Sequence, residues 1–99
     1  MQAYLTARKR HPAASRSAFA IGLVQFDQRR SYGEAAQWFS AYLREEPNGP
    51  LAEQATGRLM EAADKAGDRA TARTTAEHYL AEHPRGAYIG LARRLTANE

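Results

Sequence analysis

The sequence predicts an all-α protein made of stacked helix pairs, and three observations support this fold class. Apolar residues recur every three or four positions along almost the whole chain, and no stretch of strand length alternates apolar and polar residues. Proline and glycine interrupt this pattern at short intervals. One segment occurs twice, 37 residues apart, as AYLREEPNG at 41–49 and HYLAEHPRG at 78–86. A repeat of this length is typical of a helix-pair solenoid, in which no pair buries its apolar face alone.

Composition limits the classes of protein that the chain can belong to. Its 99 residues, 43% hydrophobic and 25% charged, suit one soluble domain or one piece of a longer array. The absence of cysteine excludes a disulfide framework, thiolate metal ligands and a cysteine nucleophile. The sequence contains no run of about 18 apolar residues, so it predicts no membrane span. Its N-terminus lacks a signal-peptide pattern. The compartment, cytoplasmic or periplasmic, stays open.

The first helices follow from local signals. Residues 1–12 resemble the tail of an earlier helix, and a first full helix is expected at 14–29. Ser31 followed by Glu34 matches a capping box, so a second helix is expected at 32–46. Pro47 ends that helix because proline removes a backbone donor and clashes with the preceding turn.

The later helices are bounded in the same way. Pro50 suits the first position of a helix at 50–65. Gly67 as C-cap and Asp68 as N-cap separate it from a helix at 69–83. Pro84 and Gly86 precede a last helix at 87–97. Short loops make neighbouring helices antiparallel. We therefore divide the single domain into a helix tail 1–12, repeats 13–47 and 48–84, and a terminal half-repeat 85–99.

The repeated segment resembles the end of a tetratricopeptide repeat (TPR). In each copy, Tyr-Leu closes a second helix, and the tyrosine is expected to fill the gap against the following pair. The family places a small residue in the second helix, an aromatic or small residue four positions later, and a proline about twelve after the first. The matching residues are Ala35, Phe39 and Pro47, then Ala72, Ala76 and Pro84.

This resemblance implies a right-handed solenoid of about five helices plus an N-terminal partial helix. The Trp and Gly-Tyr positions of the family's first helix are not matched here. The longer repeats resemble bacterial envelope TPR proteins, such as outer-membrane assembly lipoproteins and the Tol–Pal accessory protein, and TPR tails of anti-sigma regulators. The implied function is protein binding without catalysis.

Catalytic chemistry is not indicated. The histidines are His11, His78 and His83, and no metalloprotease, phosphate-loop or nucleophile-elbow motif includes them. We interpret all three as solvated surface residues and expect no enzyme activity and no cofactor.

Glu61 and Asp64 stand three positions apart on one helix and could hold a cation. A solvated face balanced by Arg58 and Lys65 is the favoured interpretation, so no metal is expected. The aromatic residues are mostly at core spacing. Trp38 points about 100° away from its neighbour and either packs on the next pair or lies half exposed, and an exposed Trp38 would be a contact anchor.

In the TPR family, the first helix of each repeat lines a concave surface. Small side chains there would leave room for an incoming segment, and carboxylates would meet a basic peptide. The alternative is that these residues only keep the face soluble. By register, the expected peptide-binding residues are Ser17, Ala20, Val24, Asp27, Gln54, Gly57, Glu61 and Asp64.

Two other functions remain open. The chain begins inside a second helix and finishes after a first helix, which indicates either a fragment of a longer array or open ends that pair with another chain. A structural or homo-oligomerisation domain is therefore one alternative. Nucleic-acid binding is less favoured, because the net charge of +3 comes from an N-terminal excess of basic residues: Arg8, Lys9, Arg10, Arg16, Arg29 and Arg30.

Overall fold

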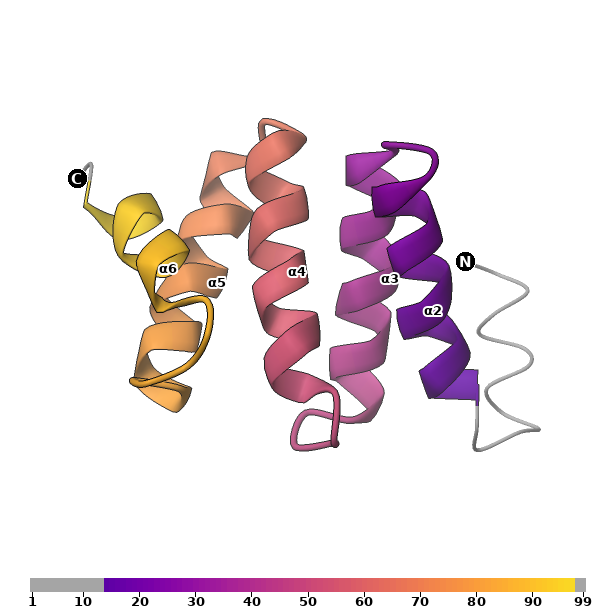
Figure 1. Cartoon of the computed structure of the whole chain (residues 1–99), viewed down its shortest axis with the longest axis horizontal. Coiled ribbons are helices and arrows are strands. Elements are labelled where there is room, and N and C mark those ends of the chain that lie inside the picture. Colours follow the sequence, from indigo (N-terminus) through magenta and orange to yellow (C-terminus); the bar gives the residue numbers. More distant parts are fainter. Residues whose placement is uncertain (1–13, 98–99) are drawn as a thin grey trace.

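The computed structural model describes residues 14–97, and within that range the chain contains five helices and no strand. They follow one another in chain order along the long axis, from the indigo to the yellow end (Figure 1). None of these helices is long and apolar enough to cross a membrane. Their bounds are α2 Ala14–Asp27, α3 Tyr32–Glu45, α4 Ala52–Lys65, α5 Arg69–Glu82 and α6 Ile89–Thr96. The helix tail expected at 1–12, with Arg8, Lys9, Arg10 and His11, lies outside the described residues.

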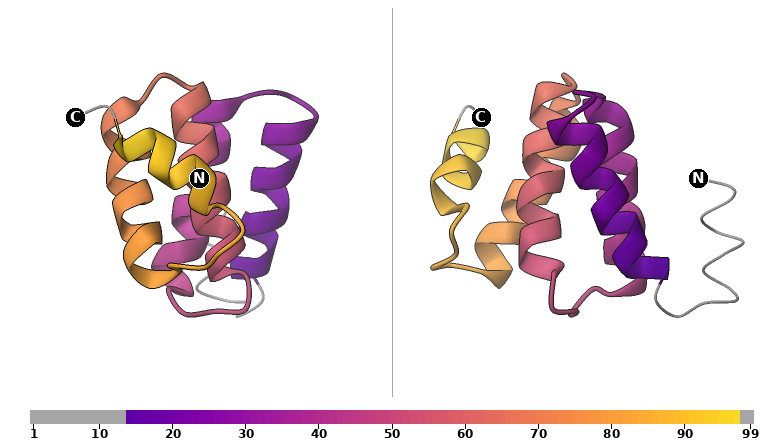
Figure 2. Two further views of the ribbon diagram at one scale, coloured as in Figure 1. Left: turned by 60° about the vertical axis from the view of Figure 1, so that its left-hand side comes forward. Right: turned by 45° about the vertical axis from the view of Figure 1, so that its right-hand side comes forward.

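Helices α2 and α3 form one antiparallel pair, α4 and α5 form the next, and α6 follows as a single helix (Figure 2). Each helix packs mainly on its neighbours in sequence. This arrangement of consecutive pairs is the helix-pair solenoid that the sequence predicts.

The turn between α4 and α5 forms as predicted from glycine and aspartate. Gly67 has a φ of 82° and directly follows the C-cap Ala66. Its N–H donates to the Asp64 carbonyl at 3.1 Å, and the Asp68 N–H donates to the Ala63 carbonyl at 2.9 Å, which completes a Schellman motif. The Asp68 side chain then accepts the N–H of Thr71 at 3.1 Å and caps α5.

Helix α3 begins at residue 32 as predicted but without its expected cap, and the predicted starts of α4 and α6 are wrong by two residues. Ser31 precedes α3 but makes no side-chain capping bond, so the expected capping box with Glu34 is not formed. Pro50 is not the first residue of α4, because it lies in a turn that the Ala52 N–H closes on the Gly49 carbonyl at 3.0 Å. Helix α6 likewise begins two residues later than expected, at Ile89.

One structural feature explains both the late starts of α4 and α6 and the repeated segment. We call it the tyrosine junction: the hydroxyl of Tyr42 or Tyr79 binds a backbone N–H just before the next helix. The N–H of Leu51 donates to the Tyr42 hydroxyl at 3.0 Å, and the N–H of Tyr88 donates to the Tyr79 hydroxyl at 2.9 Å. Each phenol thus binds the residue just before the next helix. Both rings are buried, at 1% and 0% exposed.

The glycine in each copy of the segment is required by the same contact. A Cβ atom on Gly49 would lie 2.7 Å from the Tyr42 hydroxyl oxygen, and one on Gly86 would overlap the Tyr79 hydroxyl even more closely. The repeated Tyr, Pro and Gly therefore ends one pair and attaches it to the next.

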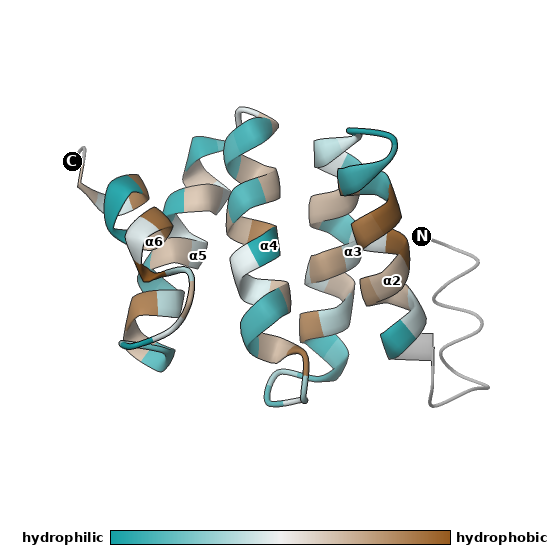
Figure 3. Ribbon diagram, viewed as in Figure 1, coloured by the Kyte–Doolittle hydropathy of each residue, from teal (hydrophilic) through white to brown (hydrophobic). Residues whose placement is uncertain are grey.

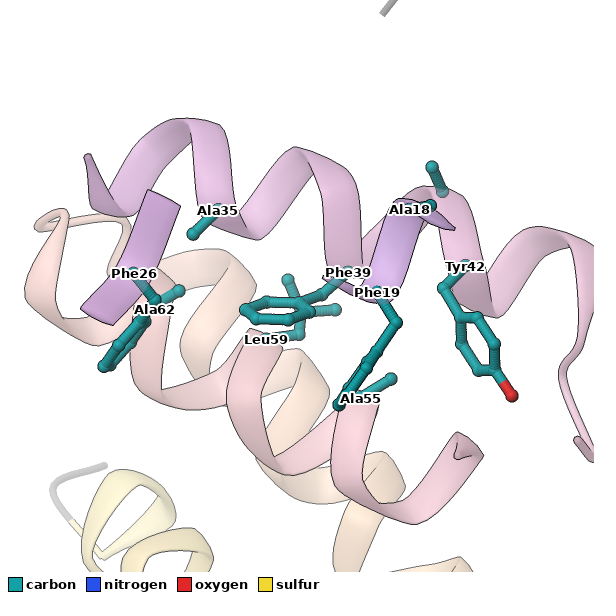
Figure 4. Close-up of a cluster of buried hydrophobic side chains, with 10 residues drawn as sticks. Ala18, Phe19, Phe26, Ala35, Phe39, Tyr42, Ala55, Leu59 and Ala62 are labelled. Carbon is teal, nitrogen blue, oxygen red and sulfur yellow. The ribbon is translucent and has the colours of Figure 1, made fainter. Parts of the chain in front are cut away.

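Two clusters of buried side chains hold the pairs together. The first spans α2, α3 and α4, with Phe19 and Phe39 rings 5.7 Å apart at its centre (Figure 4). The second is smaller and joins Met60 of α4 to Ala76 and Tyr79 of α5 and to α6. Trp38 packs against the first cluster and remains half-buried, so it combines the packing and the partial exposure that the sequence left as alternatives.

Candidate functional site

The first helices of the repeats, α2, α4 and α6, are joined by ion pairs between successive repeats. The guanidinium of Arg58 lies 3.6 Å from the Asp27 carboxylate, and that of Arg94 lies 3.1 Å from the Asp64 carboxylate. Asp27 and Asp64 are 37 residues apart and so occupy the same position in the two repeats. We call the surface of these three helices the first-helix face.

The carboxylates predicted to receive a basic peptide are thus largely balanced within the chain. Arg58 lies 3.7 Å from Glu61 as well as close to Asp27, and its guanidinium stacks over the Phe26 ring at 5.3 Å from the centroid. Lys65 does not balance Asp64, since its ammonium lies over an aromatic ring, 5.6 Å from the Tyr32 centroid. Within residues 14–97, histidine, aspartate and glutamate form no group of three that could hold a metal ion.

Gly57 does not leave room for an incoming segment, contrary to the prediction. It is buried, and the ring of Tyr88 lies so close that a Cβ atom on Gly57 would overlap it. The space that the sequence assigns to a ligand is filled by a side chain from the next repeat.

The remaining predicted residues of this face are open to solvent. Ser17, Ala20 and Gln54 are exposed, and the Glu61 side chain is 33% exposed. Val24 is 40% exposed and is the exposed large hydrophobic residue of the described range. Figure 3 shows brown, hydrophobic ribbon in the middle of the helix that carries it.

A shallow pocket of about 340 Å³ surrounds Val24 on α2, and its lining is mostly apolar. Sequence reasoning assigned Ala20 and Val24 to the site but missed the other lining residues Ile21, Gln25 and Arg29. The missed signal is the four-residue spacing of Ile21 and Gln25, which marks a single side of α2, and of Arg29 just after the end of the helix.

The exposed residues form two equivalent sets. Ser17 and Val24 of α2 occupy the same repeat positions as Gln54 and Glu61 of α4, 37 residues later. The Asp27–Arg58 pair joins the two helices, and where α2 presents a hydroxyl and an apolar side chain, α4 presents an amide and a carboxylate. This arrangement can accept an apolar side chain on α2 and a cation or amide on α4.

The histidines have different environments. His78 is exposed as expected, but His83 is half-buried, with its ring 5.1 Å from the Tyr79 ring and its Nδ1 3.8 Å from Glu53. Glu53 also accepts hydrogen bonds from the Tyr79 hydroxyl at 2.9 Å and from the Ala87 N–H at 3.3 Å. Burial raises the pKa of the Tyr79 phenol above its usual 10.0. This cluster stabilises the junction between α5 and α6.

Comparison with known protein families gives one match. The model of the family YfiO, described as outer membrane lipoprotein, matches residues 7–95. The comparisons with curated proteins and with solved structures gave no match. The match covers most of the chain, and the paired helices with their repeated junctions are what a TPR-like family requires. The chain belongs to the YfiO family of outer membrane lipoproteins, a TPR-like family of bacterial envelope type.

Proposed function

We propose that the chain is a non-catalytic protein-interaction module that binds an extended segment of another protein along the first-helix face. The membership in a TPR-like family supports the class of function. The observation that carries the finer proposal is the exposed apolar pocket at Val24 of α2, taken with the amide of Gln54 and the carboxylate of Glu61 at the solvent-facing, equivalent positions of α4. An exposed apolar patch rimmed by polar residues is typical of an interaction site.

The side chains define the chemistry of the bound segment. An apolar side chain of the segment would occupy the pocket formed by Ala20, Ile21 and Val24. A lysine or arginine nearby would bind Glu61, whose Oε1 faces Arg58 and whose second oxygen can accept a further donor. Asp27 and Asp64 serve the ion pairs between helices and are not expected to bind the segment directly.

Selection from a random-peptide display library tests this function. We expect the wild-type chain to enrich peptides that carry an apolar residue close to a lysine or arginine. Val24→Asp should abolish the enrichment, because it puts a charge into the apolar pocket. The matched control is Ala81→Asp at an exposed position of the second helix α5.

A second pair of variants tests the charge. Glu61→Gln should lower the affinity for an enriched basic peptide by about fivefold to tenfold, because it removes a charge-assisted hydrogen bond. Glu82→Gln, at an exposed position of α5, removes the same charge elsewhere. Equal loss in both variants, or enriched peptides with no basic residue, would contradict the proposed site.

A structural, self-associating domain is the second candidate, because both ends of the described chain carry partly exposed apolar residues. Ile21 and Val24 lie on α2 at one end, and Leu91 and Leu95 are half-buried on α6 at the other. Head-to-tail association of these ends predicts a molar mass that rises with concentration in sedimentation equilibrium. A monomer at all concentrations that still binds peptides would favour the interaction module.

Nucleic-acid binding is supported only by charge. Arg16, Arg29 and Arg30 are exposed, and the basic cluster at 7–10 lies outside the described residues. Such binding predicts an affinity that falls steeply between low and moderate salt.

A further inference from the structure

The two repeats differ in character at the junction between their first and second helices. In the first repeat, Phe26 of α2 and Tyr32 of α3 pack edge to face, with ring centroids 5.1 Å apart. The residues 37 positions later are Ala63 and Arg69. The second repeat therefore has a methyl group and a guanidinium where the first has two aromatic rings.

The structure has a pocket at this point of the second repeat. It holds about 260 Å³ and lies among the end of α4, the beginning of α5 and the end of α6. Three arginines line it, Arg69 and Arg73 from α5 and Arg94 from α6, and the apolar part of its lining includes Ala72 and Leu95.

The charge of the lining is predominantly positive. Asp64 is the carboxylate among the lining residues, and it lies 3.1 Å from Arg94. Arg73 lies 3.7 Å from Glu77 in an exposed ion pair, and this pair contributes little to stability because water screens the two charges. Arg69 brings a charge that neither of these pairs uses.

We propose that this pocket binds an oxyanion, either a carboxylate or a phosphate group. Arginine presents a planar fork of N–H donors that matches the oxygens of both groups, and arginines from two helices can approach one anion from different sides. The backbone N–H groups of the first turn of α5 add positive potential, which Asp68 partly offsets by capping that turn. The site borders the first-helix face through α4 and α6, but it uses neither the Val24 pocket nor Glu61, the groups proposed to bind the peptide.

The test is a titration of the ¹⁵N-labelled full chain, followed by NMR chemical shifts at constant ionic strength. Inorganic phosphate and glutamate are the two probes, and they distinguish the phosphate source from the carboxylate source. We expect saturable shifts in the amides of Arg69, Arg73 and Arg94 with at least one probe. Shifts that are linear in probe concentration, or that spread over all basic residues, would overturn the proposal.

Variants separate the pocket from general charge. Arg69→Gln should weaken the binding of the effective probe about tenfold, as expected for loss of one charged hydrogen-bond donor. Arg85→Gln removes the same charge from an exposed loop position and should change the affinity less than twofold. Equal weakening by the two variants would show that the anion responds only to net charge.

Arg69→Tyr provides a second test that does not rely on charge alone. It restores the residue that the first repeat has at this position and should fill the pocket with a ring. We expect an unchanged or raised melting temperature together with loss of anion binding. Binding that persists in folded Arg69→Tyr would place the anion elsewhere. Val24→Asp should leave anion binding intact, so failure of this site and failure of the peptide-binding face remain distinguishable.

Discussion

Removal of one hydroxyl group from the second tyrosine junction should destabilise the whole chain. The Tyr79 hydroxyl accepts the N–H of Tyr88 at 2.9 Å and donates to the Glu53 carboxylate at 2.9 Å. Tyr79→Phe removes both hydrogen bonds and leaves the ring in place. The Tyr88 N–H then lacks its acceptor in a partly buried position.

The expected magnitude follows from these two bonds. An unsatisfied, partly buried N–H costs about 1–2 kcal/mol, and the bond to the half-exposed carboxylate is worth about 1 kcal/mol more. We therefore expect Tyr79→Phe to lower the free energy of unfolding by about 2–3 kcal/mol. Tyr42→Phe is the matched control, because the Tyr42 hydroxyl makes the same backbone bond, to Leu51 at 3.0 Å. It should cost about 1–2 kcal/mol.

Urea unfolding followed by far-UV circular dichroism measures both variants. A double-mutant cycle with Glu53→Gln should assign about 1 kcal/mol to the Tyr79–Glu53 bond. If Tyr79→Phe costs less than about 0.5 kcal/mol, within the range of ordinary surface changes, the hydroxyl does not hold the junction and the explanation of the repeated segment is wrong.

The same phenol gives a pH dependence with a defined sign. Burial raises the pKa of Tyr79 above its unfolded value of 10.0, so the unfolded chain loses this proton first as pH rises. Its contribution to stability is fully present below pH 10.0 and is lost as pH rises through the folded pKa. The difference in unfolding free energy between wild type and Tyr79→Phe should therefore narrow in alkaline solution.

Further predictions concern backbone and capping positions. Gly57→Ala should lower the unfolding free energy by about 1–3 kcal/mol, because its Cβ atom would displace the Tyr88 ring. Gly33→Ala should raise the unfolding free energy by about 0.5 kcal/mol, because its Cβ atom would meet open space in α3. The urea midpoint measures both changes. Arg30→Gly should raise the unfolding free energy by about 1 kcal/mol in the same assay, since Arg30 has a φ of 53°. Hydrogen bonds from Thr71 at the start of α5 hold the pKa of Asp68 below 3.8. The contribution of Asp68 to stability is therefore present above pH 3.8 and is lost on further acidification. Asp68→Asn should remove this part of the acid dependence of the melting temperature.

The helix order could be predicted from the sequence because its signals are local. Proline ends a helix wherever it occurs in the interior pattern, so Pro47 and Pro84 mark the ends of α3 and α5 within two residues. Gly67 and Asp68 likewise determine a turn that needs no distant partner. The exact starts of α4 and α6 could not be predicted, because the N–H groups before them bind tyrosines nine residues earlier.

The candidate site was less predictable because its residues depend on contacts between repeats. Gly57 has the small side chain that suits an open groove, but Tyr88, 31 residues later, covers it. Asp64 suits a peptide-binding carboxylate, but Arg94 neutralises it. Partners about one repeat apart become visible only when the stacking register is known.

The comparison of the two repeats separates architecture from specificity. Where they agree, as at Tyr42 and Tyr79, the shared residues build the connection between helix pairs and are buried away from any ligand. Where they differ, the surface changes in character: the described chain is apolar around Val24 at the α2 end and lined by arginine around Arg69 at the α5–α6 end. Since the junctions already satisfy the backbone, the side chains at these differing positions are free to be selected for partners. Recognition by this chain should therefore be found at the positions where its repeats diverge. The repeated segment itself should not contact a partner, because its tyrosines are buried between helix pairs.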